Sequence, residues 1–216
     1  TLLNSIAGAY LPDSGTIEIN GKDVTKMSEY KRAKFIGRVF QDPLKGTAAG
    51  MQVEENLLLA SRRGESRRLR WAFSAGDHDK YKAMVSRLDL GLEDRLSTRI
   101  GLLSGGQRQA LTLLMATIKR PEVLLLDEPT AALDPKTAAK VLKITDEIVH
   151  EQHLTTLMIT HNMKDALKYG NRLIMMNNGR IIADYPEDET KNLTIDDLLK
   201  KFEETADAVS DRIVLG

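Results

Sequence analysis

Two groups of polar residues in the second half of the sequence have the types and spacing that phosphate chemistry needs. The first is the segment 104–107, Ser-Gly-Gly-Gln, which precedes a predicted helix. Its hydroxyl and glycines favour anion binding, because unpaired backbone N–H groups and the positive end of the helix dipole point the same way. The second is Asp127 and Glu128, which directly follow the apolar stretch 123–126. This order favours a nucleoside triphosphatase with a metal ligand and a base at a strand end.

The segments around these residues predict an α/β protein with a mostly parallel sheet. Buried strands are expected at 36–40, 123–126 and 155–160, and helical patterns separate them. Gln41 and His161 follow the first and third of these strands, much as Asp127 follows the second.

The other expected elements are helices and hairpins. Asn-Gly pairs at 20–21 and 178–179 are strong hairpin signals. The pattern at 212–215 also allows a small strand. The predicted hairpins span 16–24 and 173–185, and the predicted helices span 1–9, 29–34, 53–60, 80–90, 135–150, 163–169 and the charged tail from 194.

Composition sets outer limits on function. The 216 residues include 31 basic and 31 acidic side chains, so no bulk polyanion partner, such as nucleic acid, is indicated. The sequence has no cysteine, which excludes disulfides and thiolate metal sites and fits a cytoplasmic protein. No apolar run approaches the roughly 18 residues needed to cross a bilayer. Docking on a membrane protein stays open.

Five motifs carry a resemblance to a known family. The sequence resembles the ATP-binding subunit of an ABC transporter over essentially its whole length, with the motifs in family order. They are VFQDP at 39–43, LSGGQ at 103–107, VLLLDEP at 123–129, AALD at 131–134 and ITH at 159–161.

The resemblance implies a P-loop NTPase-like α/β fold with an inserted helical subdomain. It divides one ATP-binding domain, 1–216, into a catalytic core at 1–41 and 103–216 and a helical subdomain at 42–102. It also implies that Asp127 and Gln41 bind Mg²⁺. Glu128 would be the general base for water attack, Gln41 the residue that links the nucleotide to the membrane partner, and His161 a donor to the γ-phosphate.

The same resemblance places the segment 103–107, hereafter the signature segment, on the ATP held by a second subunit. Ser104, Gly105, Gly106 and Gln107 would contact that nucleotide, and Asp134 would couple the two sites across the interface. ATP would then join two head-to-tail subunits, which we expect to be a homodimer.

A P-loop of the form GxxxxGK(S/T) is missing from these residues. Family members commonly continue from that loop as GKSTLL, and this sequence starts at TLL. Thr1 therefore matches the threonine after the metal-binding serine and would reach the α-phosphate. We expect the 216 residues by themselves, truncated before the P-loop and its preceding strands, to bind ATP poorly and not to hydrolyse it.

The expected function is ATP hydrolysis that drives an importer of amino acids or similar small solutes. The helix 110–119 and the run DEPTAALDPKT resemble a branch whose permeases are of the amino-acid type. The expected partners are membrane permease subunits, with an extracytoplasmic solute-binding protein acting indirectly, and the expected location is peripheral at the cytoplasmic membrane face. A soluble ABC-type ATPase not coupled to transport is the alternative.

Structural interpretations of the same residues stay open. The carboxylates at 127–128 also suit a strand–loop junction, Gln41 also suits a plain surface position, and Ser104 also suits an ordinary helix N-cap. A basic and aromatic patch comprises Arg62, Arg63, Arg67, Arg68, Arg70, Trp71 and Phe73. It suits either a solvated loop face or contact with lipid headgroups or a permease helix.

Overall fold

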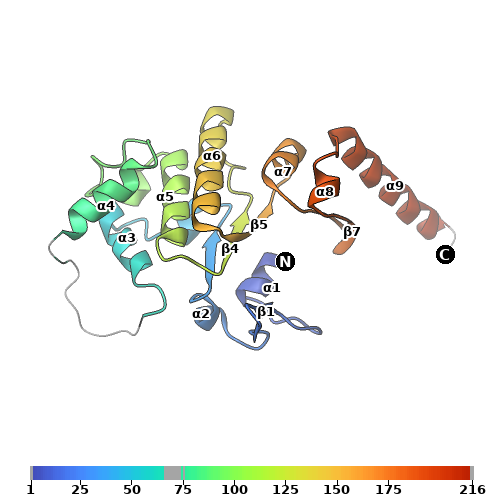
Figure 1. Ribbon diagram of the computed structural model, residues 1–216, viewed down its shortest axis with the longest axis horizontal. Coiled ribbons are helices and arrows are strands. Elements are labelled where there is room, and N and C mark those ends of the chain that lie inside the picture. Colours follow the sequence, from blue (N-terminus) through green and yellow to red (C-terminus); the bar gives the residue numbers. More distant parts are fainter. Residues whose placement is uncertain (1, 66–73, 75, 215–216) are drawn as a thin grey trace. The chain divides into compact units, whose positions relative to one another are not determined.

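The computed structural model describes residues 2–65, 74 and 76–214, with side chains through residue 204. These residues form two compact units, Thr1–Ile159 and Thr160–Gly216. Figure 1 shows the elements in chain order. In the described part of the chain, no helix combines the length and the apolar character that crossing a membrane requires.

The first unit is built around a parallel sheet of three strands in the order β3-β4-β5. The strands are β3 (Ile36–Val39), β4 (Val123–Asp127) and β5 (Thr155–Ile159). The register pairs Ile36 with Val123 and Asp127 with Ile159, so the carboxyl ends of all three strands lie at one edge. The predicted α/β fold with a parallel sheet is confirmed.

The central strand β4 is buried on both faces, which explains its uninterrupted apolar sequence. Leu124 and Leu126 pack in a cluster with residues of α5 (Gly105–Thr117). Leu125, which points to the opposite face, packs in a second cluster with residues of α1 (Leu2–Ala7). Consecutive leucines therefore hold helices on both faces of the sheet.

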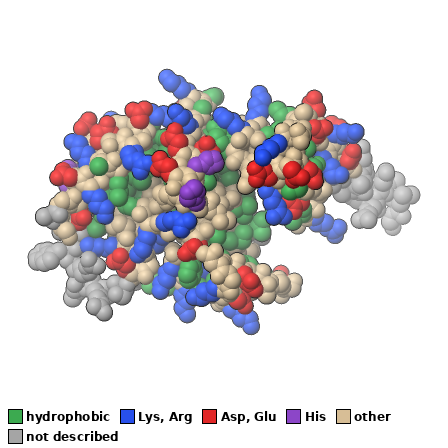
Figure 2. Space-filling view, viewed as in Figure 1, with side chains coloured by type: hydrophobic (Ala, Val, Ile, Leu, Met, Phe, Trp, Pro, Cys, Tyr) green, Lys and Arg blue, Asp and Glu red, His purple; other side chains and the backbone are tan. Residues whose placement is uncertain are grey.

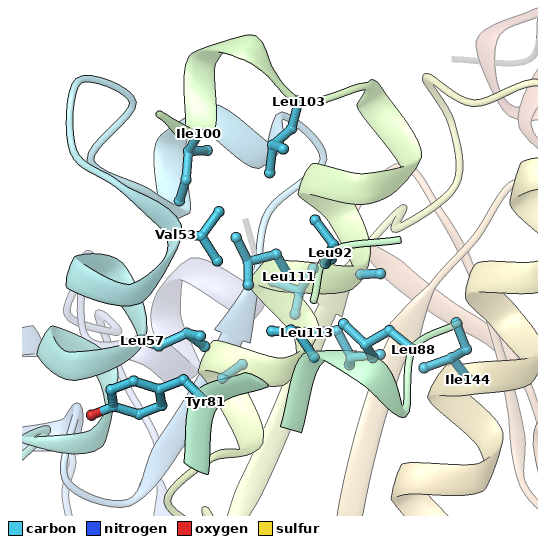
Figure 3. Close-up of a cluster of buried hydrophobic side chains, with 14 of the residues drawn as sticks. Val53, Leu57, Tyr81, Leu88, Leu92, Ile100, Leu103, Leu111, Leu113 and Ile144 are labelled. Atoms are coloured by element: carbon cyan, nitrogen blue, oxygen red, sulfur yellow. The ribbon is translucent and has the colours of Figure 1, made fainter. Parts of the chain in front are cut away.

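Between β3 and β4 the chain forms helices and turns. In order these are η1 (Pro43–Gly46), α3 (Val53–Ser61), α4 (Asp77–Ser86) and η2 (Ile100–Leu102), and α5 follows them before β4. Figure 3 shows side chains of this segment, such as Leu57 and Tyr81, converging with Leu111 of α5 and Ile144 of α6 (Pro135–Gln152). The helical character predicted for 42–102 agrees with this structure, and its treatment as a separate subdomain stays a prediction.

Both predicted hairpins are present. Strands β1 (Glu18–Ile19) and β2 (Lys22–Asp23) pair across Asn20 and Gly21. The φ angles of 49° and 71° at these two residues need the tolerance of Asn and Gly for left-handed backbone. A short helix, α2 (Glu29–Arg32), then leads into β3.

The second unit contains the other hairpin and three helices among its described residues. The elements are α7 (Met163–Tyr169), β6 (Leu173–Asn177), β7 (Arg180–Tyr185), α8 (Glu187–Thr190) and α9 (Ile195–Val214). The hairpin turns at Asn178 and Gly179, as predicted. Leu173, Met175 and Leu198 form the centre of its core.

The prediction of a small strand at 212–215 is wrong. Helix α9 continues through Val214, and Leu215 lies outside the described residues. Val209 and Ile213 stand four residues apart, which suits one face of a helix. A helix satisfies its own backbone hydrogen bonds, whereas a strand requires a partner strand.

The surface carries both signs of charge in mixture. On the face shown in Figure 2, basic and acidic side chains are interspersed, and no single sign covers it. This distribution agrees with the balance of 31 basic and 31 acidic residues in the sequence.

Candidate functional site

The carboxylates at the end of β4 are held by the sheet. Asp127 is the last residue of β4, and the N–H of Glu128 donates to the carbonyl of Ile159 at 3.0 Å. Glu128 has a φ of 47°. A left-handed backbone at a residue with a Cβ costs about 1–2 kcal/mol and persists where the surrounding structure enforces it, frequently at functional sites. This strain favours a functional role for Glu128 over an ordinary strand end.

Gln41 reaches the same carboxylate from the neighbouring strand. It follows β3 by two residues, and its Nε2 donates to Oε2 of Glu128 at 3.3 Å. The parallel pairing of Val39 with Leu126 brings these two strand ends together. The structure therefore joins two of the three residues that the sequence assigned to catalysis.

A buried glutamine supports this loop and was not singled out in the sequence. Gln109 on α5 is 2% exposed, and its Nε2 donates to the carbonyl of Phe40 at 3.5 Å. The sequence offers no clear signal for it, because Gln109 follows the polar residues Gln107 and Arg108, and packing decides that it is buried and needs a partner.

The oxygen atoms at this edge fit a magnesium ion. Asp127 offers a carboxylate and Gln41 an amide oxygen, and Mg²⁺ prefers such hard ligands. Gln41 uses its nitrogen toward Glu128, so its oxygen takes no part in that bond. Within the described residues, no cluster of three or more His, Cys, Asp or Glu side chains is suited to a metal. Magnesium here therefore requires further ligands from phosphate and water.

The signature segment begins α5 through a capping box. Ser104 is the N-cap, and its Oγ accepts from the N–H of Gln107 at 3.3 Å. In return, Oε1 of Gln107 accepts from the N–H of Ser104 at 3.1 Å. Ser104 is exposed, so this helix start faces solvent with its hydroxyl at the surface. The geometry agrees with the N-cap interpretation and leaves the segment accessible to an anion.

The second glycine of this segment is required by packing within the chain itself. A Cβ at Gly106 would lie 2.1 Å from Cγ2 of Thr137 on α6, while a Cβ at Gly105 would meet only Leu133 Cδ2 at 3.3 Å. The start of α5 therefore packs directly against the first turn of α6. Gly106 serves close helix packing, a reason that the sequence alone does not reveal.

Substitution of Gly106 by alanine should destabilise the first unit by about 1–3 kcal/mol, because the added methyl overpacks the contact with Thr137. Thr137→Ser removes the clashing Cγ2, so the double variant should recover most of the loss. Amide hydrogen exchange within α5 and α6, in both single variants and the double variant, measures the coupling. If Gly106→Ala destabilises the first unit equally with and without Thr137→Ser, the steric explanation is contradicted.

Asp134 caps the helix that carries Thr137. Its Oδ1 accepts from the N–H of Thr137 at 3.0 Å. The hydroxyl and the backbone N–H of Thr137 lower the pKa of Asp134 from its ordinary value. The observed role of Asp134 is thus an N-cap at the start of α6, and its part in coupling two nucleotide sites stays a prediction.

The remaining predicted residues are His161, Thr1 and those of the basic patch. His161 is exposed, belongs to the second unit and follows β5 by two residues. Thr1 lies outside the described residues, and so do Arg67, Arg68, Arg70, Trp71 and Phe73 of the basic patch. Arg63, from the same patch, donates to the carbonyl of Ala116 at 2.8 Å and so has a structural role in the first unit.

Comparison with known proteins decides the family. The sequence profile of the family described as ABC transporter matches residues 1–131. A tyrosine transport ATP-binding protein of Clostridioides difficile is 45% identical over 203 residues, which are 94% of this chain and 80% of that protein. This chain belongs to the ABC transporter family. The thiamine import ATP-binding protein ThiQ of a Chelativorans species is 38% identical over 185 residues, covering 85% of this chain and 70% of ThiQ.

Solved ABC cassettes share the fold of this ABC-family chain. MJ1267, an ATP-binding cassette in its ADP conformation, has a TM-score of 0.69 and 27% identity, covering 88% of this chain and 77% of MJ1267. The cassette MJ0796, solved as a dimer with ADP and Pi, has a TM-score of 0.70 over 86% of this chain and 79% of its own. At 24% identity this second likeness shows the fold alone. The expected P-loop NTPase-like cassette fold is confirmed.

Proposed function

We propose that this ABC-family chain hydrolyses ATP to power an importer. The contact of Gln41 with Glu128, beside the last residue of β4, is the observation that carries this proposal. The relatives are named for tyrosine transport, thiamine import and, in the case of CysA, sulfate/thiosulfate import. These names favour transport over a soluble ABC-type ATPase.

The chemistry is the attack of water on the γ-phosphate of ATP. Glu128 accepts the proton of that water, the bond from the γ-phosphorus to the bridging oxygen breaks, and ADP and phosphate leave. Gln41 holds the Glu128 carboxylate through its amide. His161 donates to the γ-phosphate. Asp127 and Gln41 would hold a magnesium ion, which would neutralise phosphate charge when bound.

Two copies of the chain form the working unit. The exposed N-terminus of α5 presents Ser104 and its neighbours to the ATP bound by the other copy, because free N–H groups at a helix start bind phosphate. Asp134, the N-cap of α6, binds the N–H of Thr137, which packs against Gly106, and couples the two nucleotide sites.

A groove of about 640 Å³ in the first unit suits a segment of the permease. One wall comes from α2 and β3, and the other comes from the end of α3 and from α5. The charged residues that line it are Lys34, Arg38, Arg62, Arg63 and Glu65. This excess of basic groups favours an acidic helix as the occupant. Leu59, which is 54% exposed at the groove, adds apolar surface.

The groove connects with the catalytic edge through η1. Gly46, at the end of η1, lines the groove, and η1 begins two residues after Gln41. A permease segment seated there can therefore displace the loop that holds Gln41 against Glu128. This connection couples hydrolysis to movement of the membrane subunits.

Leu59→Asp should lower the amount of permease that co-purifies with the chain by about tenfold, because an apolar anchor is lost and a negative charge is added. The ATPase activity of the isolated cassette should not change. Ile181→Asp, on an exposed residue of β7 outside the groove, is the matched control. Undiminished co-purification of the Leu59 variant would place the permease elsewhere.

The transported solute is an amino acid or a similar small molecule, supplied to the permease by an extracytoplasmic binding protein. The similarity to a tyrosine transport protein supports this class. In this arrangement the chain sits as a peripheral subunit on the cytoplasmic face of the membrane.

The test uses the chain joined to a P-loop segment ahead of Thr1, hereafter the complete cassette, co-expressed with a permease and reconstituted in vesicles. We expect ATP-dependent uptake of tyrosine or another amino acid, and no uptake with the Glu128→Gln variant. ATP hydrolysis without any permease association would support the soluble alternative. Uptake of thiamine but no amino acid would retain the importer and overturn the solute class.

A further inference from the structure

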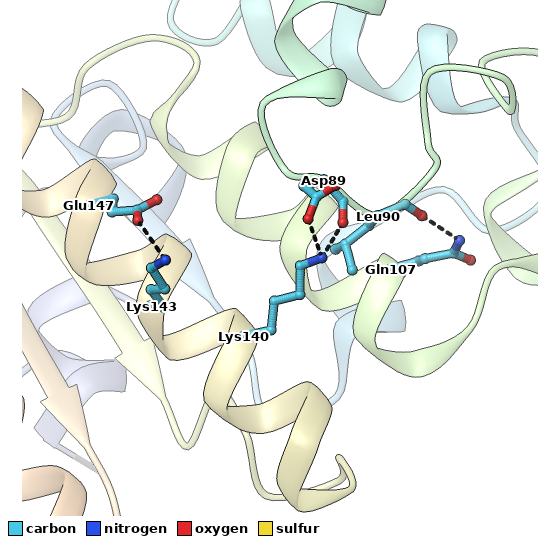
Figure 4. A network of polar contacts seen from close by, with 6 residues as sticks. All are labelled: Asp89, Leu90, Gln107, Lys140, Lys143 and Glu147. Atoms are coloured by element: carbon cyan, nitrogen blue, oxygen red, sulfur yellow. Dashed lines mark hydrogen bonds and ion pairs between the residues drawn. The ribbon is translucent and has the colours of Figure 1, made fainter.

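A chain of polar contacts joins α6 to the signature segment (Figure 4). Nζ of Lys140 on α6 donates to the backbone carbonyl of Asp89 and, at 2.8 Å, to its Oδ2. The next carbonyl, that of Leu90, accepts from Nε2 of Gln107 at 3.0 Å. Lys140 therefore binds the loop at Asp89, and the next residue of this loop, Leu90, binds the side chain of Gln107.

Both ends of the Gln107 amide are engaged. Its nitrogen donates to Leu90, and its oxygen accepts from the N–H of Ser104. A side-chain amide with both groups bonded has one orientation. Loss of the Leu90 contact would free the amide to turn, and the N–H of Ser104 would lose its acceptor. The position of Leu90 thus controls the order of the capping box.

The loop at Asp89 needs an external hold. Asp89 has a φ of 51°, in the left-handed region, and its side chain is 92% exposed. Buried Leu88 and Leu92 anchor the chain on either side of it. Lys140 binds both the carbonyl and the carboxylate of this strained residue, so it sets the direction of the peptide that precedes Leu90.

The same face of α6 touches the signature segment at a second point. Asp134, Thr137 and Lys140 are spaced by three residues, which places them along one side of the helix. Thr137 packs against Gly106, and Lys140 acts on Gln107 through the loop. Helix α6, whose N-cap is Asp134, therefore contacts the signature segment directly through Thr137 and indirectly through Lys140.

We propose that Lys140 is a positioning residue that presents the signature segment to the nucleotide of the partner copy. It acts through Asp89, Leu90 and Gln107 and does not touch the nucleotide itself. The expected effect on ATP-driven dimerisation rests on the proposed function. The pair is exposed and adds little to stability, so its effect is on orientation.

The test compares Lys140→Met with Lys143→Met in the complete cassette. Lys143 lies on the same helix and, among the described residues, pairs along it with Glu147 at 3.7 Å, so it is a matched control (Figure 4). Lys140→Met should weaken ATP-dependent dimerisation about fivefold, measured by sedimentation, and should leave ATP binding to the monomer unchanged. Lys140→Arg should restore dimerisation, because its guanidinium also donates to a carbonyl and a carboxylate together.

Nuclear magnetic resonance of the side-chain amides gives a readout that does not depend on ATP. The Gln107 signals should move in Lys140→Met and in Asp89→Asn, and should stay in place in Lys143→Met. Unmoved Gln107 signals in Lys140→Met would overturn the inference, as would equal losses of monomer ATP binding and dimerisation. If the wild-type cassette binds ATP without dimerising, the proposed ATP-driven dimerisation is refuted. The amide signals would then still test whether Lys140 positions Gln107.

Discussion

Replacement of Glu128 by glutamine is expected to lower ATP turnover by roughly 10²- to 10⁴-fold, the usual contribution of a general base. The amide cannot accept the proton of the attacking water. It keeps nearly the same shape, and Gln41 can still donate to its oxygen, so the loop should stay in place. ATP binding should therefore persist, and the variant should accumulate as a dimer closed around unhydrolysed ATP.

The measurement is phosphate release under saturating ATP, together with sedimentation to detect the dimer. Glu122→Gln makes the same chemical change at the opposite end of β4, where Glu122 accepts from Asn20 at 2.5 Å. That control should retain wild-type turnover. Wild-type turnover in Glu128→Gln would remove this residue from the role of base.

Replacement of Arg32 by methionine should destabilise the first unit on the order of 3 kcal/mol, because hydrogen bonds to a buried charged group are among the strongest in a protein. Arg32 is completely buried. Its guanidinium donates to four backbone carbonyls, those of Ser5, Ile6, Thr25 and Met27, at 2.7–2.8 Å.

The position of α1 depends on these bonds. Ser5 and Ile6 belong to the last turn of α1, whose carbonyls have no partner within the helix. A methionine fills similar volume and removes the guanidinium donor from all four carbonyls, of which that of Ser5 still accepts from the N–H of Gly8 at 3.2 Å. Burial lowers the pKa of Arg32, an effect that Asp23 opposes by its charge, and the guanidinium still carries its positive charge at neutral pH.

Amide hydrogen exchange within α1 and β2 is the suitable measurement, because the chain has two units and need not unfold in one step. Lys31→Met, at the exposed neighbouring position on α2, controls for loss of a positive charge. Unchanged protection in Arg32→Met would show that α1 does not depend on this arginine.

Local chemistry in the sequence was sufficient to predict most elements of this protein. Asn-Gly pairs set both hairpins, since their backbone tolerates left-handed angles at those positions. Apolar runs predicted the three parallel strands, and Ser104 with the two glycines after it predicted the start of α5. The motifs at 39–43, 103–107 and 123–129 pointed to an ABC cassette, which the comparisons confirm. The tail at 212–215 misled, because a short apolar run is compatible with both strand and helix.

Only the tertiary structure revealed how these residues support one another. The amide of Gln41 meets Glu128 across 87 residues of sequence, and Lys140 reaches Asp89 across 51. Gly106 is needed because Thr137 approaches it, and Arg32 is buried although Lys31 beside it is exposed. Such contacts depend on which strands and helices become neighbours. Packing decides that arrangement between residues far apart in the chain, and no local pattern records it.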